Sequence, residues 1–227
     1  MIDSSSEKVK PAWQFFRKSK TTYETAVGTM EEPLIRLVDQ LKDKFKTGEY
    51  FLLIGDDASG RLPALVLKRV ANYISDRNGV QRPDMRFIRG GRFDTYERYV
   101  KEVDLASQVA VLLETVKARP TNKRALLVTE FISGGRIAKR IASELNQRGI
   151  RMDVATLDML TSRDRYREYG IPEDVKIYSG LEKHIEPPIQ QHRELTGLLS
   201  QRWRSQQDVA AARKDVKKLS DKIIASL

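Results

Sequence analysis

The sequence has no cysteine and only two histidines, and these absences exclude or weaken several classes of functional site. Without cysteine there is no thiol nucleophile, no disulfide framework, and no thiolate ligand for zinc or an iron–sulfur cluster. His184 and His192 do not have the HExxH spacing, so they give little support to a metalloenzyme or a histidine-based catalytic triad. We expect both histidines to lie on the surface.

Long hydrophobic runs are also missing. The longest stretch without a charged residue, Leu105 to Leu113, is far shorter than the roughly 20 apolar residues that cross a bilayer. The start of the chain, Met1 to Ser4, lacks the apolar core of a signal peptide. We therefore expect a soluble, cytoplasmic protein with no membrane partner.

The 227 residues have the composition of a globular protein, because 40% are hydrophobic and 32% are charged. A chain of this length is typical of one core with an appendage. Its 41 basic and 31 acidic residues give a net charge of +10. This charge would support salt-sensitive, non-specific binding to nucleic acid, but no RNP, KH or helix-turn-helix pattern points to specific recognition.

Short apolar runs alternate with amphipathic stretches through the middle of the chain. Strands are predicted at Tyr50–Gly55, Met85–Ile88, Arg124–Val128 and Asp153–Leu157, with a weaker candidate at Val175–Tyr178. Helical spacing predicts helices at about 29–46, 62–76, 100–116 and 137–145, the first opened by a capping box of Thr29 and Glu32. This alternation predicts an α/β fold with an open, mainly parallel sheet and helices on both faces.

The pattern divides the chain into three parts. Residues 1–28 are expected to form an N-terminal arm with a short helix, 29–180 the α/β core, and 181–227 a helical C-terminal extension. In the extension, apolar residues recur at alternating steps of three and four: Val209, Ala212, Val216, Leu219 and Ile223. We expect this helix to mediate self-association or to dock a partner protein.

Ligands of open α/β sheets bind beyond the carboxyl ends of the strands, so two loops are candidates for a site. One follows Tyr50–Gly55 and the other, Thr129 to Gly135, follows the strand predicted at Arg124–Val128. Each contains glycine and leads into a helix N-terminus, where free N–H groups and the helix dipole favour a phosphate. Neither loop has the GxGxxG or GxxxxGK[ST] pattern.

Both loops resemble motifs of the type I phosphoribosyltransferases. The segment Ala125–Gly135 (ALLVTEFISGG) is similar to the family signature, in which a strand of four apolar residues leads into acidic residues and a Ser/Thr- and Gly-rich phosphate loop. The segment Gly55–Ala64 (GDDASGRLPA) resembles the family's pyrophosphate loop. The order and separation of the two motifs also suit the family.

The resemblance implies a phosphoribosyltransferase-like core that binds phosphoribosyl pyrophosphate (PRPP) or another phosphorylated ribose or nucleotide. An active member would be a PRPP-dependent glycosyltransferase that displaces pyrophosphate from C1 with a nitrogenous nucleophile, with Mg²⁺ brought in through PRPP. Glu130 would then be the catalytic carboxylate that accepts hydrogen bonds from the ribose hydroxyls. The other implied positions are the phosphate and ribose residues Thr129, Ser133, Gly134, Gly135 and Arg136, the pyrophosphate loop Ala58, Ser59, Gly60 and Arg61, and possible metal ligands Asp56 and Asp57.

The sequence also departs from the family pattern. Thr129 stands where the family has the first of two acidic residues, and Arg136 and Ile137 stand where it has the last residues of the phosphate loop. Simpler interpretations remain, in which Glu130 caps the following helix and the two aspartates occupy a turn. Three functions stay open: a transferase, a non-catalytic scaffold or nucleotide-sensing subunit, and a charge-driven nucleic-acid binder. The sequence leaves undecided whether the protein is an enzyme.

Overall fold

A computed structural model describes residues 30–56, 60–88, 104–116, 124–132, 135–159, 170–181 and 206–227, with the side chains of 206–212 left aside. The predicted N-terminal arm, 1–28, lies outside these residues. The elements are, in chain order, α2 (Glu31–Lys46), β1 (Tyr50–Asp56), α3 (Arg61–Arg77), β2 (Asp84–Ile88), α4 (Leu105–Glu114), β3 (Arg124–Ile132), α5 (Arg136–Asn146), β4 (Met152–Met159), β5 (Ile177–Ser179) and α8 (Gln206–Ala225).

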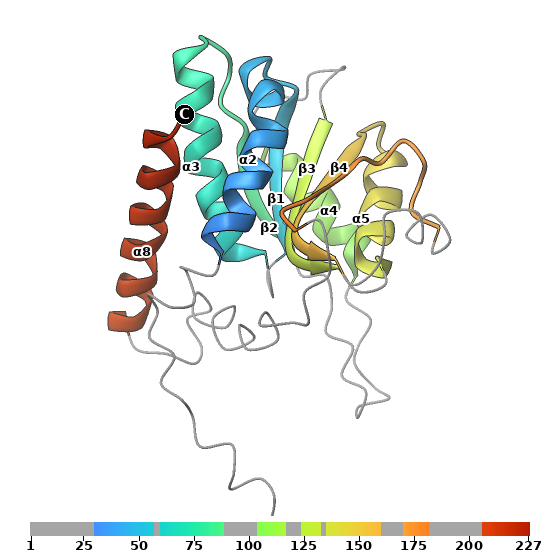
Figure 1. The fold of residues 1–227 in the computed structure, drawn as a ribbon. Helices are drawn as coiled ribbons and strands as arrows, with labels where there is room; N and C mark the ends of the chain where they lie inside the picture. Colours follow the sequence, from blue (N-terminus) through green and yellow to red (C-terminus); the bar gives the residue numbers. More distant parts are fainter. Residues whose placement is uncertain are drawn as a thin grey trace, which may run out of the picture.

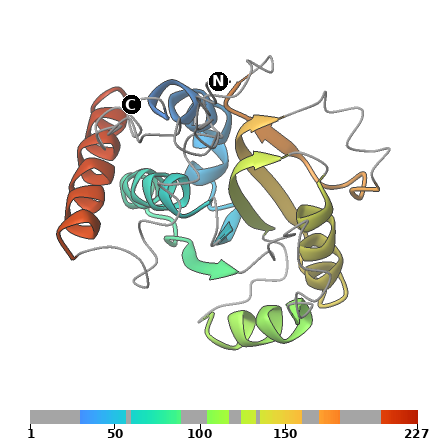
Figure 2. The same ribbon diagram turned by 90° about the horizontal axis from the view of Figure 1, so that it is seen from below.

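The five strands form one parallel sheet in the order β2-β1-β3-β4-β5. Helices α2 and α3 cover one face of this sheet, and α4 and α5 cover the other (Figures 1 and 2). The predicted open parallel α/β sheet with helices on both faces is therefore confirmed. In the part of the chain that the structure describes, no helix is long and apolar enough to cross a bilayer.

The burial of the strands follows their place in the sheet. Every residue of the inner strands β1 and β4 is buried, as expected for strands covered by helices on both faces. The edge strand β2 is only half-buried until its last residue, Ile88. The apolar runs that predicted the inner strands were thus clear because both faces of these strands require apolar side chains.

Helix α8 packs along the outer side of α3, away from the sheet (Figure 1). Its apolar side chains Val216, Leu219 and Ile223 are buried in the core cluster that α2 and α3 also line. Two ion pairs flank this contact: Arg69 with Asp221 at 3.0 Å, and Lys222 with Glu31 at 2.6 Å. These apolar residues of the repeat therefore pack against the protein's own core. Docking of a partner protein by this helix stays a prediction.

Several predicted boundaries were wrong. Strand β3 continues to Ile132, so Thr129 and Glu130 lie in a strand where a loop was expected, because β3 stays paired with β4 up to Ile132 and Met159. Helix α4 ends at Glu114 and is capped by Asp104, whose carboxylate accepts from the Ser107 N–H; its predicted start, 100–103, lies outside the described residues.

The start of α2 also differs from the prediction. The residue before the helix is Met30, which makes no side-chain capping bond, so the helix begins one residue later than a cap at Thr29 implies. Thr29 itself lies outside the described residues. The two acidic residues of the first turn, Glu31 and Glu32, still lie where the helix dipole favours negative charge.

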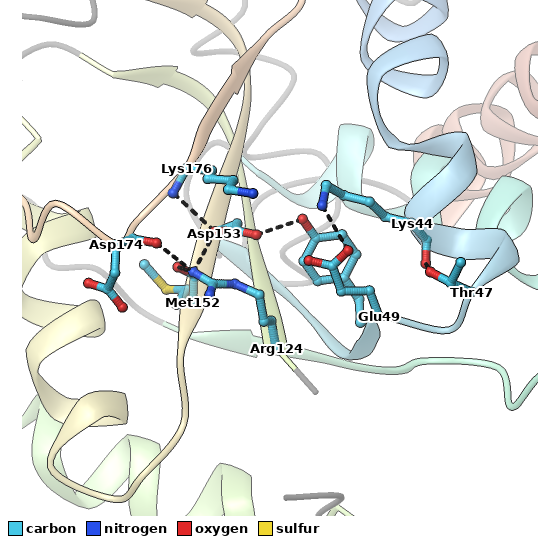
Figure 3. Close-up of polar contacts among 9 residues, drawn as sticks. Lys44, Thr47, Glu49, Arg124, Met152, Asp153, Asp174 and Lys176 are labelled. Atoms are coloured by element: carbon cyan, nitrogen blue, oxygen red, sulfur yellow. Dashed lines mark hydrogen bonds and ion pairs between the residues drawn. The ribbon is translucent and has the colours of Figure 1, made fainter. Parts of the chain in front are cut away.

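A buried polar network ties the amino ends of the inner strands together (Figure 3). The Asp153 carboxylate accepts hydrogen bonds from Arg124 at 2.7 Å, from the Tyr50 hydroxyl at 2.8 Å and from the Lys176 N–H at 3.0 Å. Arg124 also donates to the backbone oxygen of Asp174 at 2.7 Å. Burial, and then the Asp153 charge, raise the pKa of Tyr50, which keeps its hydroxyl a donor. This network lies at the end of the sheet opposite the predicted ligand loops.

Candidate functional site at the carboxyl ends of β1 and β3

The strand order reverses between β1 and β3. From β1 the chain proceeds to β2 on one side, and it then returns to add β3 on the other side. In open α/β sheets such a switch point is where the connections diverge and leave room for a ligand beyond the carboxyl ends of the two strands. The helices that follow these strands, α3 and α5, begin at the same edge.

Gly60 brings the first candidate loop into contact with β3. It is the residue before α3, and its N–H donates to the Asp56 backbone oxygen at 2.6 Å. A Cβ atom added to Gly60 would lie 2.0 Å from the Val128 backbone oxygen and 2.7 Å from the Asp56 nitrogen. Only glycine fits this close approach, so the end of the first loop is held directly against β3, next to Thr129 and Glu130.

Gly135 opens α5 in the left-handed region, with φ of +63°. No side chain caps either α3 or α5 among the described residues, and neither helix has an acidic residue in its first turn. Instead, each helix begins with an arginine, Arg61 or Arg136, which the positive end of the helix dipole disfavours. Two helix starts that have a glycine at the N-cap and an arginine in the first turn would together favour a bound anion.

The two arginines have different surroundings. The Arg61 guanidinium lies 5.0 Å from the centroid of the Phe87 ring on β2, a cation–π distance, and the side chain is half-buried. Arg136 is exposed. Arg61 is thus held beside β2, whereas Arg136 stands at the open start of α5.

Glu130 is the most unusual residue of this edge. It is only 3% exposed, and its Oε1 atom is buried without a hydrogen-bond partner among the described residues. Burial raises the pKa of the Glu130 carboxyl from its ordinary value of 4.5 to about 8. The Glu130 side chain makes no hydrogen bond to α5 among the described residues, so the structure does not support the simpler interpretation of Glu130 as the capping residue of this helix.

Two further carboxyls lie at the ends of the neighbouring strands. Asp56 ends β1 and is 7% exposed, and Asp158 in β4 is 1% exposed and accepts the Met159 N–H at 2.7 Å. The Thr156 hydroxyl lies 3.4 Å from the Glu130 backbone oxygen and 2.7 Å from that of Asp158, so it links β3 to β4. Sequence reasoning missed Asp158, although it has the same signal as Glu130: an acidic residue near the end of a buried apolar strand.

The remaining predicted positions are only partly described. Thr129 is 6% exposed, and its hydroxyl lies 3.4 Å from the Phe131 backbone oxygen. The predicted residues Asp57, Ala58, Ser59, Ser133 and Gly134 lie outside the described residues. The described residues contain no group of three or more acidic or histidine side chains that could hold a metal ion. The expected Mg²⁺ ligands therefore stay a prediction.

A separate hollow of about 400 Å³ opens between the last turns of α2, α3 and α8. Its lining mixes charges, with Lys42, Lys46 and Arg77 beside Asp39, which pairs with Lys42 at 2.9 Å. Helix α3 runs for 17 residues, or about 25 Å, between Gly60 and this hollow. The hollow is thus not part of the candidate site.

Comparisons with known proteins give little further information. No protein-family model and no curated protein sequence matches the chain. Among solved structures, the purine phosphoribosyltransferase of Pyrococcus horikoshii Ot3 is similar with a TM-score of 0.36 and 16% identity, over 68% of this chain and 92% of that chain. A similarity of this size assigns no family, and the fold class rests on the five parallel strands.

Proposed function

We propose that the carboxyl edge of β1 and β3 binds a phosphorylated ribose, either PRPP or a nucleotide. The observation that carries this proposal is Glu130, a buried carboxyl whose Oε1 has no hydrogen-bond partner among the described residues. Glu130 lies in β3, the strand that leads to the start of α5. A polar atom left in this state costs about 1–3 kcal/mol, which a ligand hydroxyl would offset. The motif resemblance found in the sequence supports the same type of ligand.

The phosphate of this ligand would bind at the start of α5. Backbone N–H groups of the first helical turn point outward there, and the dipole favours an anion by about 0.3–1 kcal/mol. Arg136 adds an exposed positive charge at the same turn. The sequence places Ser133 and Gly134 immediately before this turn.

The ribose would lie against Glu130. Because its pKa is about 8, the Glu130 carboxyl is protonated at neutral pH and can both donate and accept a hydrogen bond. The two hydroxyls of a ribose can each donate and accept a hydrogen bond. They therefore match the neutral Glu130 carboxyl better than an anionic ligand group would. Glu130 therefore selects for hydroxyls, while the start of α5 selects for phosphate.

We infer that the domain binds the phosphorylated ribose but that its glycosyl transfer activity is reduced or lost. Thr129 stands where the resembling family has a second carboxylate, and Glu130 is itself protonated at neutral pH. Neither position therefore supplies the negative charge that would stabilise a cationic ribosyl transition state. Mg²⁺ would arrive on the pyrophosphate of PRPP, near the carboxyl end of β1, where Asp56 lies. A domain that binds without turnover would serve as a nucleotide sensor or a scaffold.

Isothermal titration with PRPP and Mg²⁺ tests the proposal, with ribose 5-phosphate and AMP as further ligands. Glu130→Ala should weaken binding by about tenfold or more, whereas Glu173→Ala, at an exposed carboxyl outside the site, should not. Gly135→Asp should abolish binding, because it sets a negative charge at the phosphate position. Gly135→Asn has the same size and backbone strain without the charge, and it should retain measurable affinity.

The absence of heat with all three ligands would refute the proposed function. Binding that is equally affected by Gly135→Asp and Gly135→Asn would argue against a phosphate at α5. Release of pyrophosphate from PRPP, followed with a panel of bases and amines, decides between a transferase and a non-catalytic binding domain.

A further inference from the structure

Helix α8 has two chemically distinct faces. Its inner face carries the buried residues Val216, Leu219 and Ile223, which pack on the side of α3. Another face of the helix carries four exposed basic side chains: Arg213, Lys214, Lys217 and Lys218. Helix α8 is also the outermost element on its side of the molecule, as both ribbon views show (Figures 1 and 2). The exposed face is therefore open to a large partner.

The acidic residues near this face are largely neutralised. Asp221 pairs with Arg69 on α3, and Lys222 pairs with Glu31 on α2. No ion pair with a described residue is formed by the four basic side chains, and Asp215 is the one acidic residue among them. The two central turns of α8 thus present a net charge of about +3 to solvent.

We propose that this basic face of α8, formed by Arg213, Lys214, Lys217 and Lys218, binds the phosphate backbone of a nucleic acid without reading its sequence. Lys214 and Lys218 are one helical turn apart, about 6 Å along the axis, and each nucleic-acid strand carries a phosphate about every 3.4 Å along its axis. Lysine and arginine contacts to phosphates supply affinity and orientation but no base specificity.

The composition of the face favours nucleic acid over other anionic partners. Protein interfaces are depleted in lysine and enriched in aromatic side chains, whereas this face consists of three lysines and one arginine. An amphipathic helix that lies on a membrane inserts its apolar face, but the apolar face of α8 is already buried inside the chain. The proposal is independent of the proposed ribose site, because it involves none of the same residues.

Fluorescence anisotropy with a labelled DNA duplex of about 20 base pairs tests the proposal across a salt series from about 50 to 200 mM. The double variant Lys214→Gln/Lys218→Gln should lower the slope of log affinity against log salt by about 0.9 for each lost phosphate contact, and weaken binding at the lowest salt by on the order of tenfold for each. The matched control, Lys139→Gln/Lys176→Gln, removes two exposed lysines elsewhere and should leave the slope unchanged.

Three results would overturn the proposal. The first is that the DNA duplex does not bind at the lowest salt. The second is that the control variant loses as much slope as the Lys214→Gln/Lys218→Gln variant. The third is that polyglutamate or phosphatidylserine vesicles bind as tightly as the duplex and that this binding also depends on Lys214 and Lys218. Circular dichroism of both double variants should match that of the unmodified protein, since all four lysines are exposed.

Discussion

Replacing Glu130 by glutamine should change how stability depends on pH. In the folded protein the Glu130 carboxyl has a pKa of about 8, whereas in an unfolded chain it returns to about 4.5. Between these two values the unfolded state releases a proton that the folded state retains. Unfolding therefore becomes easier as pH rises through this window, and Glu130→Gln, which carries no titrating proton, removes this effect.

The size of the change follows from the two pKa values. One pKa unit corresponds to about 1.4 kcal/mol, so between pH 5 and pH 7 the Glu130 carboxyl lowers the free energy of unfolding by about 2–3 kcal/mol. Glutamine has nearly the same shape and, like the protonated acid, is neutral. We therefore expect the variant to match the unmodified protein within about 1 kcal/mol at pH 5 and to exceed its stability by about 3 kcal/mol at pH 7.

Urea unfolding followed by circular dichroism at pH 5, 6, 7 and 8 measures this difference directly. Glu173→Gln, at an exposed position, serves as the control and should give a curve parallel to that of the unmodified protein. A stability difference between Glu130→Gln and the unmodified protein that is the same at every pH would refute the claim that Glu130 is held as a buried, protonated acid.

Two further substitutions test the close contacts of the fold. Arg124→Met leaves the fully buried Asp153 without its cation, although the hydrogen bonds from Tyr50 and Lys176 remain. We expect the free energy of unfolding, measured in urea, to fall by about 3 kcal/mol. A fall of less than about 1 kcal/mol would contradict a stabilising ion pair. Gly60→Ala forces a methyl group against the Val128 oxygen and should lower the free energy of unfolding by about 2–3 kcal/mol. The control, Gly79→Ala, should lower it less, because φ is +63° there but nothing lies within 4 Å of the added methyl group. Equal losses would argue against the contact of Gly60 with β3.

The sequence was sufficient for the order of strands and helices because the inner strands need apolar residues on both faces. It failed at the ends of β3 and β4 for a physical reason. The polar residues Thr129 and Asp158 look like the start of a loop, but pairing between the two strands extends the sheet through them, and this pairing joins residues far apart in the sequence. The candidate site lies in these extended ends.

Contacts between distant residues were equally invisible to the sequence. Tyr50, Arg124 and Asp153 are each the first residue of a predicted strand, yet no local pattern indicates that they meet. The contact of Gly60 with Val128 joins the end of the first candidate loop to strand β3, two segments that the sequence could relate only through a motif resemblance. The structure shows that glycine at position 60 allows strand β3 to approach closely.

The continuation of β3 to Ile132 affects how readily Glu130 can engage a partner molecule. A side chain on a flexible loop must lose backbone freedom when it binds, at about 1–2 kcal/mol for each residue that becomes fixed. The backbone of Glu130 lies between the Thr129–Thr156 and Phe131–Asp158 pairs of the sheet, so this freedom is already lost when the chain folds. Recognition through Glu130 therefore starts from a pre-organised strand and should be rigid and selective for shape.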